Sequence, residues 1–268
     1  MSRIAKRFQK LKSENKKALI PYVTAGDCNP QVTVPLMHSM VEAGADIIEL
    51  GVPFSDPMAD GPVIQLACER ALEHKVSLSD VLNMVAEFRA KDSETPVVLM
   101  GYLNPVEVMG YKNFAERAKT AGLDGVLTVD MPPEESTELL NELKANDLDA
   151  IFLVSPESTV ERFQSIAQSG SGFIYYVSLK GVTGVKTIDT DAVAAKLSEL
   201  RKHTDVPIGV GFGINDAATA ASVAKISDAV VVGSSVVKRI DANQNNPEKI
   251  NGEIHAFLSE LRQAMDAV

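Results

Sequence analysis

Short, continuously apolar stretches alternate with amphipathic stretches along most of the chain. Strands that are buried on both faces, as in a parallel sheet, have this continuous apolar character. The stretches between them repeat apolar residues at the spacing of helices. The sequence therefore predicts eight βα units. The predicted strands are 18–24, 46–52, 96–102, 125–130, 149–155, 173–178, 207–213 and 228–235.

Eight βα units in 268 residues have the size of a (β/α)8 barrel. We therefore expect an α/β fold, a single TIM barrel domain over residues 1–268. The alternative is a doubly wound open sheet, which usually has a glycine-rich turn after its first strand. The turn at 24–27 is not of that kind.

Two helices are expected beyond the eight of a simple barrel. Ile4, Phe8 and Leu11 recur at helical spacing, which predicts an extra N-terminal helix packed against the body. Two helical stretches, 63–72 and 78–90, follow the second strand, so one of them is extra.

The limits of two further helices follow from turn residues. The stretch Met131-Pro-Pro133 is expected to lead directly from the fourth strand into a helix. Pro156 and Ser158 are expected to open the helix after the fifth strand.

Composition and charge narrow the class of protein. The chain is 45% hydrophobic and 23% charged, which is typical of a soluble globular enzyme. Its net charge of −10 argues against nucleic acid or an anionic membrane as a partner. No apolar run approaches the roughly 20 residues that cross a bilayer.

The cysteines and the N-terminus indicate the compartment. Cys28 and Cys68 are too few for a disulfide framework, fit a reducing compartment, and are interpreted as buried thiols. Residues 1–12 lack the apolar segment of a secretory signal, although a basic targeting segment remains an alternative. We expect a cytoplasmic protein.

Glu49 lies inside an apolar strand, where a carboxylate is costly unless it is paired or used. One interpretation is an ion pair across the barrel mouth, but no Lys or Arg follows a neighbouring predicted strand. The other is proton transfer, since burial would raise the pKa toward neutrality as a general acid–base requires.

The loop after this strand is rich in proline and carries Asp56 and Asp60. Asp60 is a second candidate for the chemistry. It has a structural alternative, in which it caps the helix that begins near Gly61, and Pro62 at a first helical position supports that alternative.

A phosphate site is predicted where the seventh and eighth strands end, because active sites of this fold lie at the carboxyl ends of the strands. Gly213 and the Gly233-Ser234 pair let backbone N–H groups approach an anion beside a helix N-terminus. The alternative is a pair of tight turns that require glycine.

Other residues were weighed for chemistry. Lys180 follows the sixth strand and could form a Schiff base, but it falls in a glycine-containing loop and is interpreted as solvated. None of the four histidines lies near the mouth, so no metal site is predicted. Four residues at strand ends suit either the barrel core or the floor of an apolar substrate pocket: Tyr22, Met100, Leu127 and Leu153.

Several stretches together resemble one family, the α subunit of tryptophan synthase. The most specific is Glu49 to Pro62, and the resemblance extends over essentially the whole chain. Further matching stretches are 21–27, 181–184, 211–214 and 233–234. The chain departs from common family residues at Tyr22, Met100 and Val129, which puts details of the pocket in doubt.

The resemblance implies a retro-aldol cleavage of indole-3-glycerol phosphate to indole and glyceraldehyde 3-phosphate, in the last steps of L-tryptophan biosynthesis. It implies no cofactor in this chain. It also implies a β subunit that binds pyridoxal phosphate, receives indole through a tunnel and joins this chain in an α2β2 heterotetramer.

Carried over by position, the resemblance makes Glu49 the general acid–base and places Asp60 against the indole N–H. It places Tyr175 in the lining and Thr183 in a lid. The residues implied for the phosphate are Gly184, Gly213, Gly233 and Ser234.

The partner surface follows from the loop itself. Asp56 and Pro57 belong to a stiff segment beside the mouth, which suits docking of the β subunit. We expect the partner to favour a closed lid that excludes water.

Two other functions stay open on the sequence. One is a different phosphate-sugar enzyme of the same fold, such as an isomerase or an aldolase that uses Lys180. The other is a non-catalytic subunit, against which the presence of Glu49 and Asp60 argues.

Overall fold

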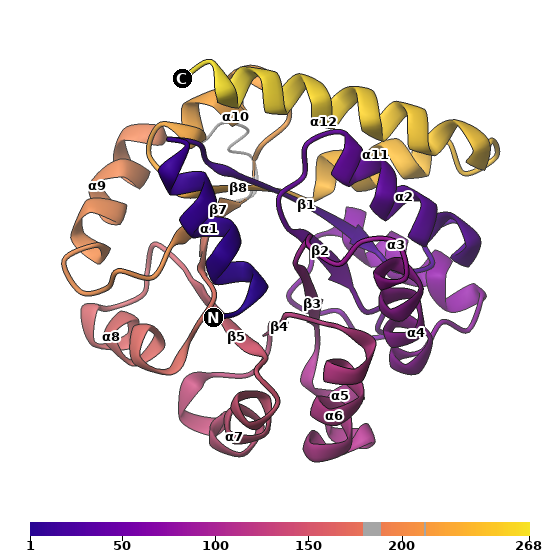
Figure 1. Ribbon diagram of the computed structural model, residues 1–268, viewed down its shortest axis with the longest axis horizontal. Helices are drawn as coiled ribbons and strands as arrows, with labels where there is room; N and C mark the ends of the chain where they lie inside the picture. The colour runs from indigo at the N-terminus through magenta and orange to yellow at the C-terminus, as the bar shows by residue number, and fades with distance from the viewer. Residues whose placement is uncertain (179–188, 212) are drawn as a thin grey trace.

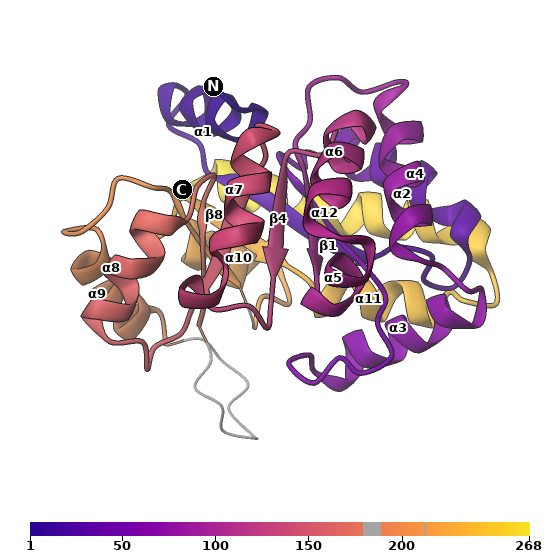
Figure 2. The same ribbon diagram turned by 90° about the horizontal axis from the view of Figure 1, so that it is seen from below.

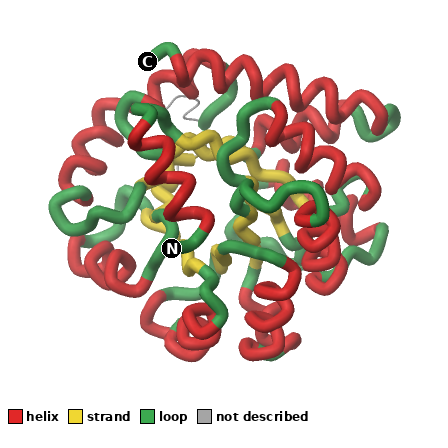
Figure 3. The backbone as a smooth tube through the Cα atoms, viewed as in Figure 1, coloured by secondary structure: helices red, strands yellow, loops and turns green. Residues whose placement is uncertain are grey.

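A computed structural model of the chain describes residues 1–178, 189–211 and 213–268. Eight parallel strands pair in sequence order and close on themselves, with helices around them (Figures 1 and 3). The strands are β1 (Ala18–Thr24), β2 (Ile48–Gly51), β3 (Val97–Gly101), β4 (Gly125–Thr128), β5 (Asp149–Val154), β6 (Ile174–Val177), β7 (Ile208–Gly211) and β8 (Ala229–Val232). The predicted TIM barrel is confirmed, and the open sheet is excluded.

The helices follow the predicted alternation. They are α1 (Arg3–Ser13), α2 (Pro30–Glu42), α3 (Pro62–Glu73), α4 (Leu78–Arg89), α5 (Leu103–Met109), α6 (Tyr111–Ala121), α7 (Thr137–Ala145), α8 (Val160–Ser169), α9 (Thr190–Leu200), α10 (Ala217–Ala224), α11 (Ser234–Ala242) and α12 (Ile250–Asp266). Two short 3₁₀ turns, Pro133–Glu135 and Pro247–Lys249, precede α7 and α12. No described helix is both long and apolar enough to cross a membrane.

Both predicted extra helices are present. Helix α1 starts at Ser2, whose hydroxyl accepts the Ala5 N–H at 3.2 Å, and it buries Ile4, Phe8 and Leu11. It covers one end of the barrel, whereas α3 lies at the other end (Figure 2). The amphipathic pattern of α1 is therefore explained by packing, and α3 with α4 supplies the second extra helix.

Three local predictions were wrong. Helix α5 was not predicted, because it is short and contains Pro105; Asp130 accepts the Leu103 N–H at 2.8 Å at its start. A 3₁₀ turn, Pro133–Glu135, lies between Met131-Pro132 and α7, so the helix does not follow the prolines directly. Helix α8 is capped by Thr159, whose hydroxyl accepts the Arg162 N–H at 3.2 Å, and so starts after Pro156 and Ser158.

One hydrogen bond recurs at the amino-terminal end of the barrel. A side chain shortly before each even-numbered strand accepts an N–H near the start of the preceding odd-numbered strand. The pairs are Asp46 with Leu19 (2.9 Å), Asp124 with Val97 (2.8 Å), Ser171 with Ala150 (3.1 Å) and Asp228 with Ile208 (2.9 Å). These bonds join neighbouring strands in pairs, at the end of the barrel that α1 covers.

Asp124→Ala should lower the free energy of unfolding by about 3–5 kcal/mol, the cost of breaking a buried ion pair. Asp124 is 4% exposed and accepts from Arg89 at 2.5 Å and from Arg3 at 2.9 Å, besides Val97. Urea unfolding measures the change. Glu116→Ala is the control, because it removes only an exposed ion pair with Lys112 within α6 and should leave the midpoint almost unchanged. Equal effects of the two substitutions would contradict the role of Asp124.

Candidate active site

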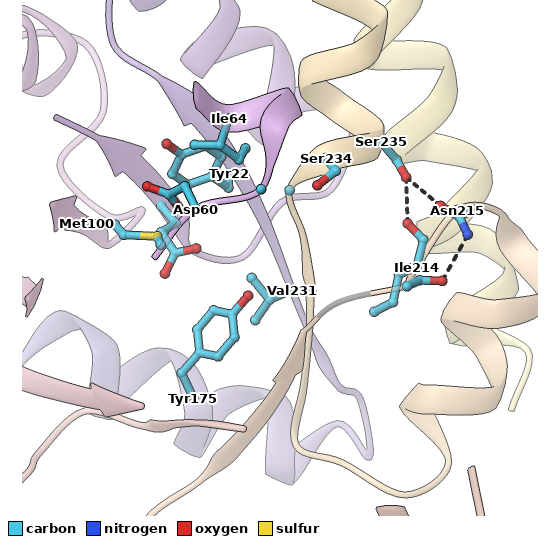
Figure 4. Close-up of a pocket in the computed structure, with 14 residues that line it drawn as sticks. Tyr22, Asp60, Ile64, Met100, Tyr175, Ile214, Asn215, Val231, Ser234 and Ser235 are labelled. Atoms are coloured by element: carbon cyan, nitrogen blue, oxygen red, sulfur yellow. Dashed lines mark hydrogen bonds between the residues drawn. The ribbon is translucent and has the colours of Figure 1, made fainter. Parts of the chain in front are cut away.

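A cavity of about 630 Å³ opens at the carboxyl ends of the strands (Figure 4). Strand side chains form one part of its wall, and three loops with the first turns of α3 and α11 form the rest. The lining residues are Tyr22, Glu49, Asp60, Gly61, Ile64, Met100, Tyr175, Gly213, Ile214, Asn215, Val231, Gly233, Ser234 and Ser235. This is the end of the barrel at which sites of this fold lie.

The cavity brings together most of the residues singled out in the sequence. These are Tyr22, Glu49, Asp60, Met100, Tyr175, Gly213, Gly233 and Ser234. Thr183, Gly184 and Lys180 lie outside the described residues. Asp56 and Pro57 lie in the loop before α3 and do not line the described cavity.

Leu127 is in a different place from the one expected of a pocket residue. It is 0% exposed and belongs to the buried cluster inside the barrel, with Val98 and Ile151. The described cavity is lined by residues of β1, β2, β3, β6 and β8, and β4 contributes no side chain to it. The geometry therefore supports the core interpretation of Leu127 and not the substrate floor.

Glu49 is fixed in β2 between Tyr22 of β1 and Val98 of β3, its register partners. It is 1% exposed, and its Oε1 atom has no hydrogen-bond partner among the described residues. Burial, with a smaller contribution from the charge of Asp60, raises its pKa to about 8. No ion pair of the described residues includes Glu49, so the structural ion-pair interpretation fails there, and the carboxyl holds a proton at neutral pH.

Asp60 is held by Tyr102 from the end of β3. The Tyr102 hydroxyl donates to Asp60 Oδ2 at 2.9 Å and accepts the Ala59 N–H at 3.0 Å. Its ring stacks on Phe54, with centroids 5.1 Å apart. Helix α3 is capped by Gly61 without a side-chain bond, so the capping interpretation of Asp60 is wrong.

The pKa of Asp60 is the balance of two effects. Burial raises it above its usual value, and the hydrogen bond from Tyr102 lowers it. The hydroxyl therefore favours the ionised form of Asp60 beside the protonated Glu49. The sequence did not reveal this contact, because residues 60 and 102 are brought together only by the barrel.

Two glycines make room for the tyrosine hydroxyls of the wall. A Cβ at Gly51 would lie 2.2 Å from Tyr22 Oη, and a Cβ at Gly211 would lie 2.1 Å from Tyr175 Oη. Tyr22 Oη also forms a 3.1 Å hydrogen bond with Thr24 Oγ1. Each tyrosine hydroxyl therefore occupies the space that a side chain at the glycine would fill.

The opposite wall is suited to an anion. Helix α11 starts at Ser234 after Gly233, so its first N–H groups face the cavity region, and Gly213 adopts a φ of +77° that favours glycine. Such a helix N-terminus attracts negative charge. Among the described lining residues there is no Lys or Arg, so backbone groups provide this attraction.

The described residues do not form a metal site. Within the residues that the structure describes, no group of three or more His, Cys, Asp or Glu side chains is placed to hold a metal ion. The described site therefore offers two carboxyl groups, an apolar wall and a set of backbone N–H groups.

The fold and the chemistry of this cavity define the class: a (β/α)8-barrel enzyme whose site contains a protonated carboxyl group. Comparison with known proteins specifies it further. The model of the family "Tryptophan synthase alpha chain" matches residues 8–266. The tryptophan synthase alpha chain of Nitrosococcus oceani is 62% identical over 267 residues, which cover 100% of this chain and 98% of that one.

Solved structures agree with the sequence comparison. The crystal structure of tryptophan synthase subunit alpha from Legionella pneumophila has a TM-score of 0.93 and 45% identity, and the match covers 100% of both chains. A chain of the tryptophan synthase complex from Pyrococcus furiosus has a TM-score of 0.81 and 34% identity, with 92% of this chain and 98% of that chain covered. The chain belongs to the tryptophan synthase alpha chain family.

Glu49→Gln should change how stability depends on pH. The wild-type carboxyl has a pKa of about 8 when folded and about 4.5 when unfolded, so the folded state binds more protons between these values. The free energy of unfolding should therefore fall as the pH rises from about 4.5 to about 8. Glutamine does not titrate, so the variant should lose this decrease, which is on the order of a few kcal/mol. Urea unfolding at pH 5 and pH 8 tests this, and parallel pH curves would refute it.

Proposed function

We propose that Glu49 and Asp60 carry out the reaction of this family in this chain. The chain is a lyase of tryptophan biosynthesis, which cleaves indole-3-glycerol phosphate to indole and glyceraldehyde 3-phosphate. The observation that supports Glu49 as the acid–base is its buried carboxyl group, with a pKa of about 8 and an oxygen that no described residue satisfies.

The reaction needs two proton transfers at neighbouring atoms. Protonation of indole C3 gives an indolenine cation, and removal of the proton from the adjacent side-chain hydroxyl then breaks the carbon–carbon bond. The bonding electrons return to the indole ring, and the hydroxyl carbon becomes the aldehyde. Glu49 gives the first proton and accepts the second, so it ends the cycle protonated as it began.

Asp60 stabilises the positive charge that develops on the indole ring. Protonation of C3 places positive charge on the indole nitrogen, and an ionised carboxylate facing its N–H stabilises that charge. Asp60 is held for this role by Tyr102. Burial raises the pKa of Asp60, and the same hydrogen bond opposes that rise by stabilising the anion.

The rest of the cavity matches the two ends of the substrate. Tyr22, Ile64, Met100, Tyr175 and Val231 offer an apolar wall for indole. Gly213, Gly233 and Ser234 offer backbone N–H groups for the phosphate. We propose Gly184 as a further phosphate contact and Thr183 as a lid residue, on the family resemblance of the sequence alone.

We also propose that a β subunit docks on the mouth, over the loop that contains Asp56 and Pro57. Met58 in this loop and Val108 in α5 are 86% and 81% exposed, so a partner could bury both side chains. The α2β2 assembly, the pyridoxal phosphate in the β subunit and the cytoplasmic location are part of this proposal.

Met58→Glu should weaken activation of indole release by added β subunit, since it places a charge in an apolar contact. Val268→Glu, at the end of α12 and also exposed, is the matched control. Loss of activation in both variants, or in neither, would reject this docking surface.

Glu49→Gln should reduce indole release from indole-3-glycerol phosphate by roughly 10²–10⁴-fold, the usual contribution of a general acid–base. In the wild type, kcat/KM should fall as the pH rises through about 8, because only the protonated carboxyl can give the first proton. Glu253→Gln, on the exposed face of α12, should change neither. A Glu49→Gln enzyme with near-normal turnover would exclude this role.

Tyr102→Phe should reduce kcat/KM by roughly tenfold, because a hydrogen bond to a charged group is lost while the stacked ring is kept. The pKa of Asp60 should rise, so the decrease in activity at acid pH should begin at a higher pH than in the wild type. Tyr111→Phe, at the start of α6, provides the comparison. A uniform loss at every pH would show that Tyr102 acts on folding alone.

A further inference from the structure

The proposed phosphate cradle is built from two segments that are distant in sequence. One is 213–215, which follows β7, and the other is 233–235, which follows β8. The parallel pairing of these strands ends at Gly211 with Val231. Beyond that pair, no backbone ladder among the described residues fixes one segment relative to the other.

A side-chain hydroxyl makes the connection that the ladder does not. Ser235 donates to the Ile214 carbonyl at 2.7 Å and to Asn215 Oδ1 at 3.2 Å (Figure 4). Among the described residues, these are the hydrogen bonds that join the two segments. Asn215 in turn donates from Nδ2 to the Gly213 carbonyl at 3.1 Å, and so holds the turn that Gly213 makes.

Ser235 is suited to hold rather than to bind. It is 6% exposed, and its hydroxyl is directed at the Ile214 carbonyl on the far side of the cradle from Tyr175 and Asp60 (Figure 4). Its one proton is already shared between two acceptors. A phosphate would therefore meet the backbone around Ser234, with the Ser235 hydroxyl behind it.

The described lining of the cavity has no cationic side chain, so the geometry of its backbone N–H groups is important. No Lys or Arg lines the described cavity, so an anion depends on oriented N–H groups. Hydrogen bonds weaken steeply when the angle departs from linear. A small shift between the two segments would thus reduce the affinity for phosphate. A flexible lysine side chain, in contrast, could move with the phosphate.

We propose that Ser235 and Asn215 are positioning residues, which lock the two halves of the cradle in one geometry for the phosphate. This inference rests on the proposed function, which places the phosphate at Gly213, Gly233 and Ser234. It adds two residues that touch no reacting atom and act through the backbone that they hold.

The test compares two probes that differ only in the phosphate: indole-3-propanol phosphate and indole-3-propanol. Ser235→Ala should weaken binding of the phosphate ester by about tenfold, because a buried hydrogen bond is lost and the Ile214 carbonyl is left without its donor. Binding of the alcohol should be unchanged. In turnover, the KM for indole-3-glycerol phosphate should rise with little change in kcat.

A second variant and a control separate positioning from general stability. Asn215 is exposed, so Asn215→Ala should fold, and it should show the same selective defect with a smaller size. The double variant should lose less than the two single effects combined, because the residues share one connection. Ser227→Ala is the control: this serine is 0% exposed and donates to the Val223 and Ala229 carbonyls, both at 2.9 Å, before β8 begins. It should lower stability and leave the preference for phosphate intact.

The outcomes distinguish the inference from the proposed function. If the wild type does not prefer the ester over the alcohol, the phosphate site itself is wrong. If the wild type has that preference and both Ser235→Ala and Asn215→Ala keep it in full, the positioning role is overturned. Equal weakening of ester and alcohol in both variants, or loss of the preference in Ser227→Ala as well, would also overturn it.

Discussion

The burial of Glu49, whose Oε1 atom has no partner among the described residues, is the constraint around which the site is arranged. An ionised carboxylate would be unstable in this strand, and the protein avoids that state by holding the proton up to a pH of about 8. Such a group stabilises the fold less and less as the pH rises. The opposite end of the barrel shows the reverse arrangement, since Asp46, Asp124 and Asp228 each accept a strand N–H and an arginine hydrogen. Stability and chemistry are thus placed at different ends.

How much could be read from the sequence depended on whether the cause was local. The strands were predictable because each is continuously apolar, and Glu49 was conspicuous for interrupting one of them. Helix α5 was not predictable, because its seven residues contain a proline and its first N–H depends on the distant side chain of Asp130. The contacts of Tyr102 with Asp60 and of Ser235 with Asn215 join residues 42 and 20 positions apart, and no local pattern marks them.

Leu127 shows what periodicity cannot decide. Met100 and Leu127 are register partners at the ends of neighbouring strands, and the same inward pattern predicts both as pocket residues. Only Met100 lines the described cavity, to which β4 contributes no side chain. Alternation along a strand says which side chains point inward. The loops and the helices α3 and α11 decide which inward side chains stay uncovered.

The described cavity would bring several negatively charged groups close together. Glu49 and Asp60 line the described cavity, where the proposed phosphate would add further negative charge in a chain of net charge −10. Protonation of Glu49 removes its repulsion of the phosphate. The first turn of α11, on the opposite wall, attracts the phosphate and so offsets the repulsion from Asp60. Oriented N–H groups attract an anion without adding a full positive charge, which would lower the pKa of Glu49 and remove the proton that the reaction needs. The described lining, which contains no lysine or arginine, is therefore consistent with the acid–base role proposed for Glu49. Binding of the phosphate would then depend on the hydroxyl of Ser235, since backbone groups attract an anion only where they are held.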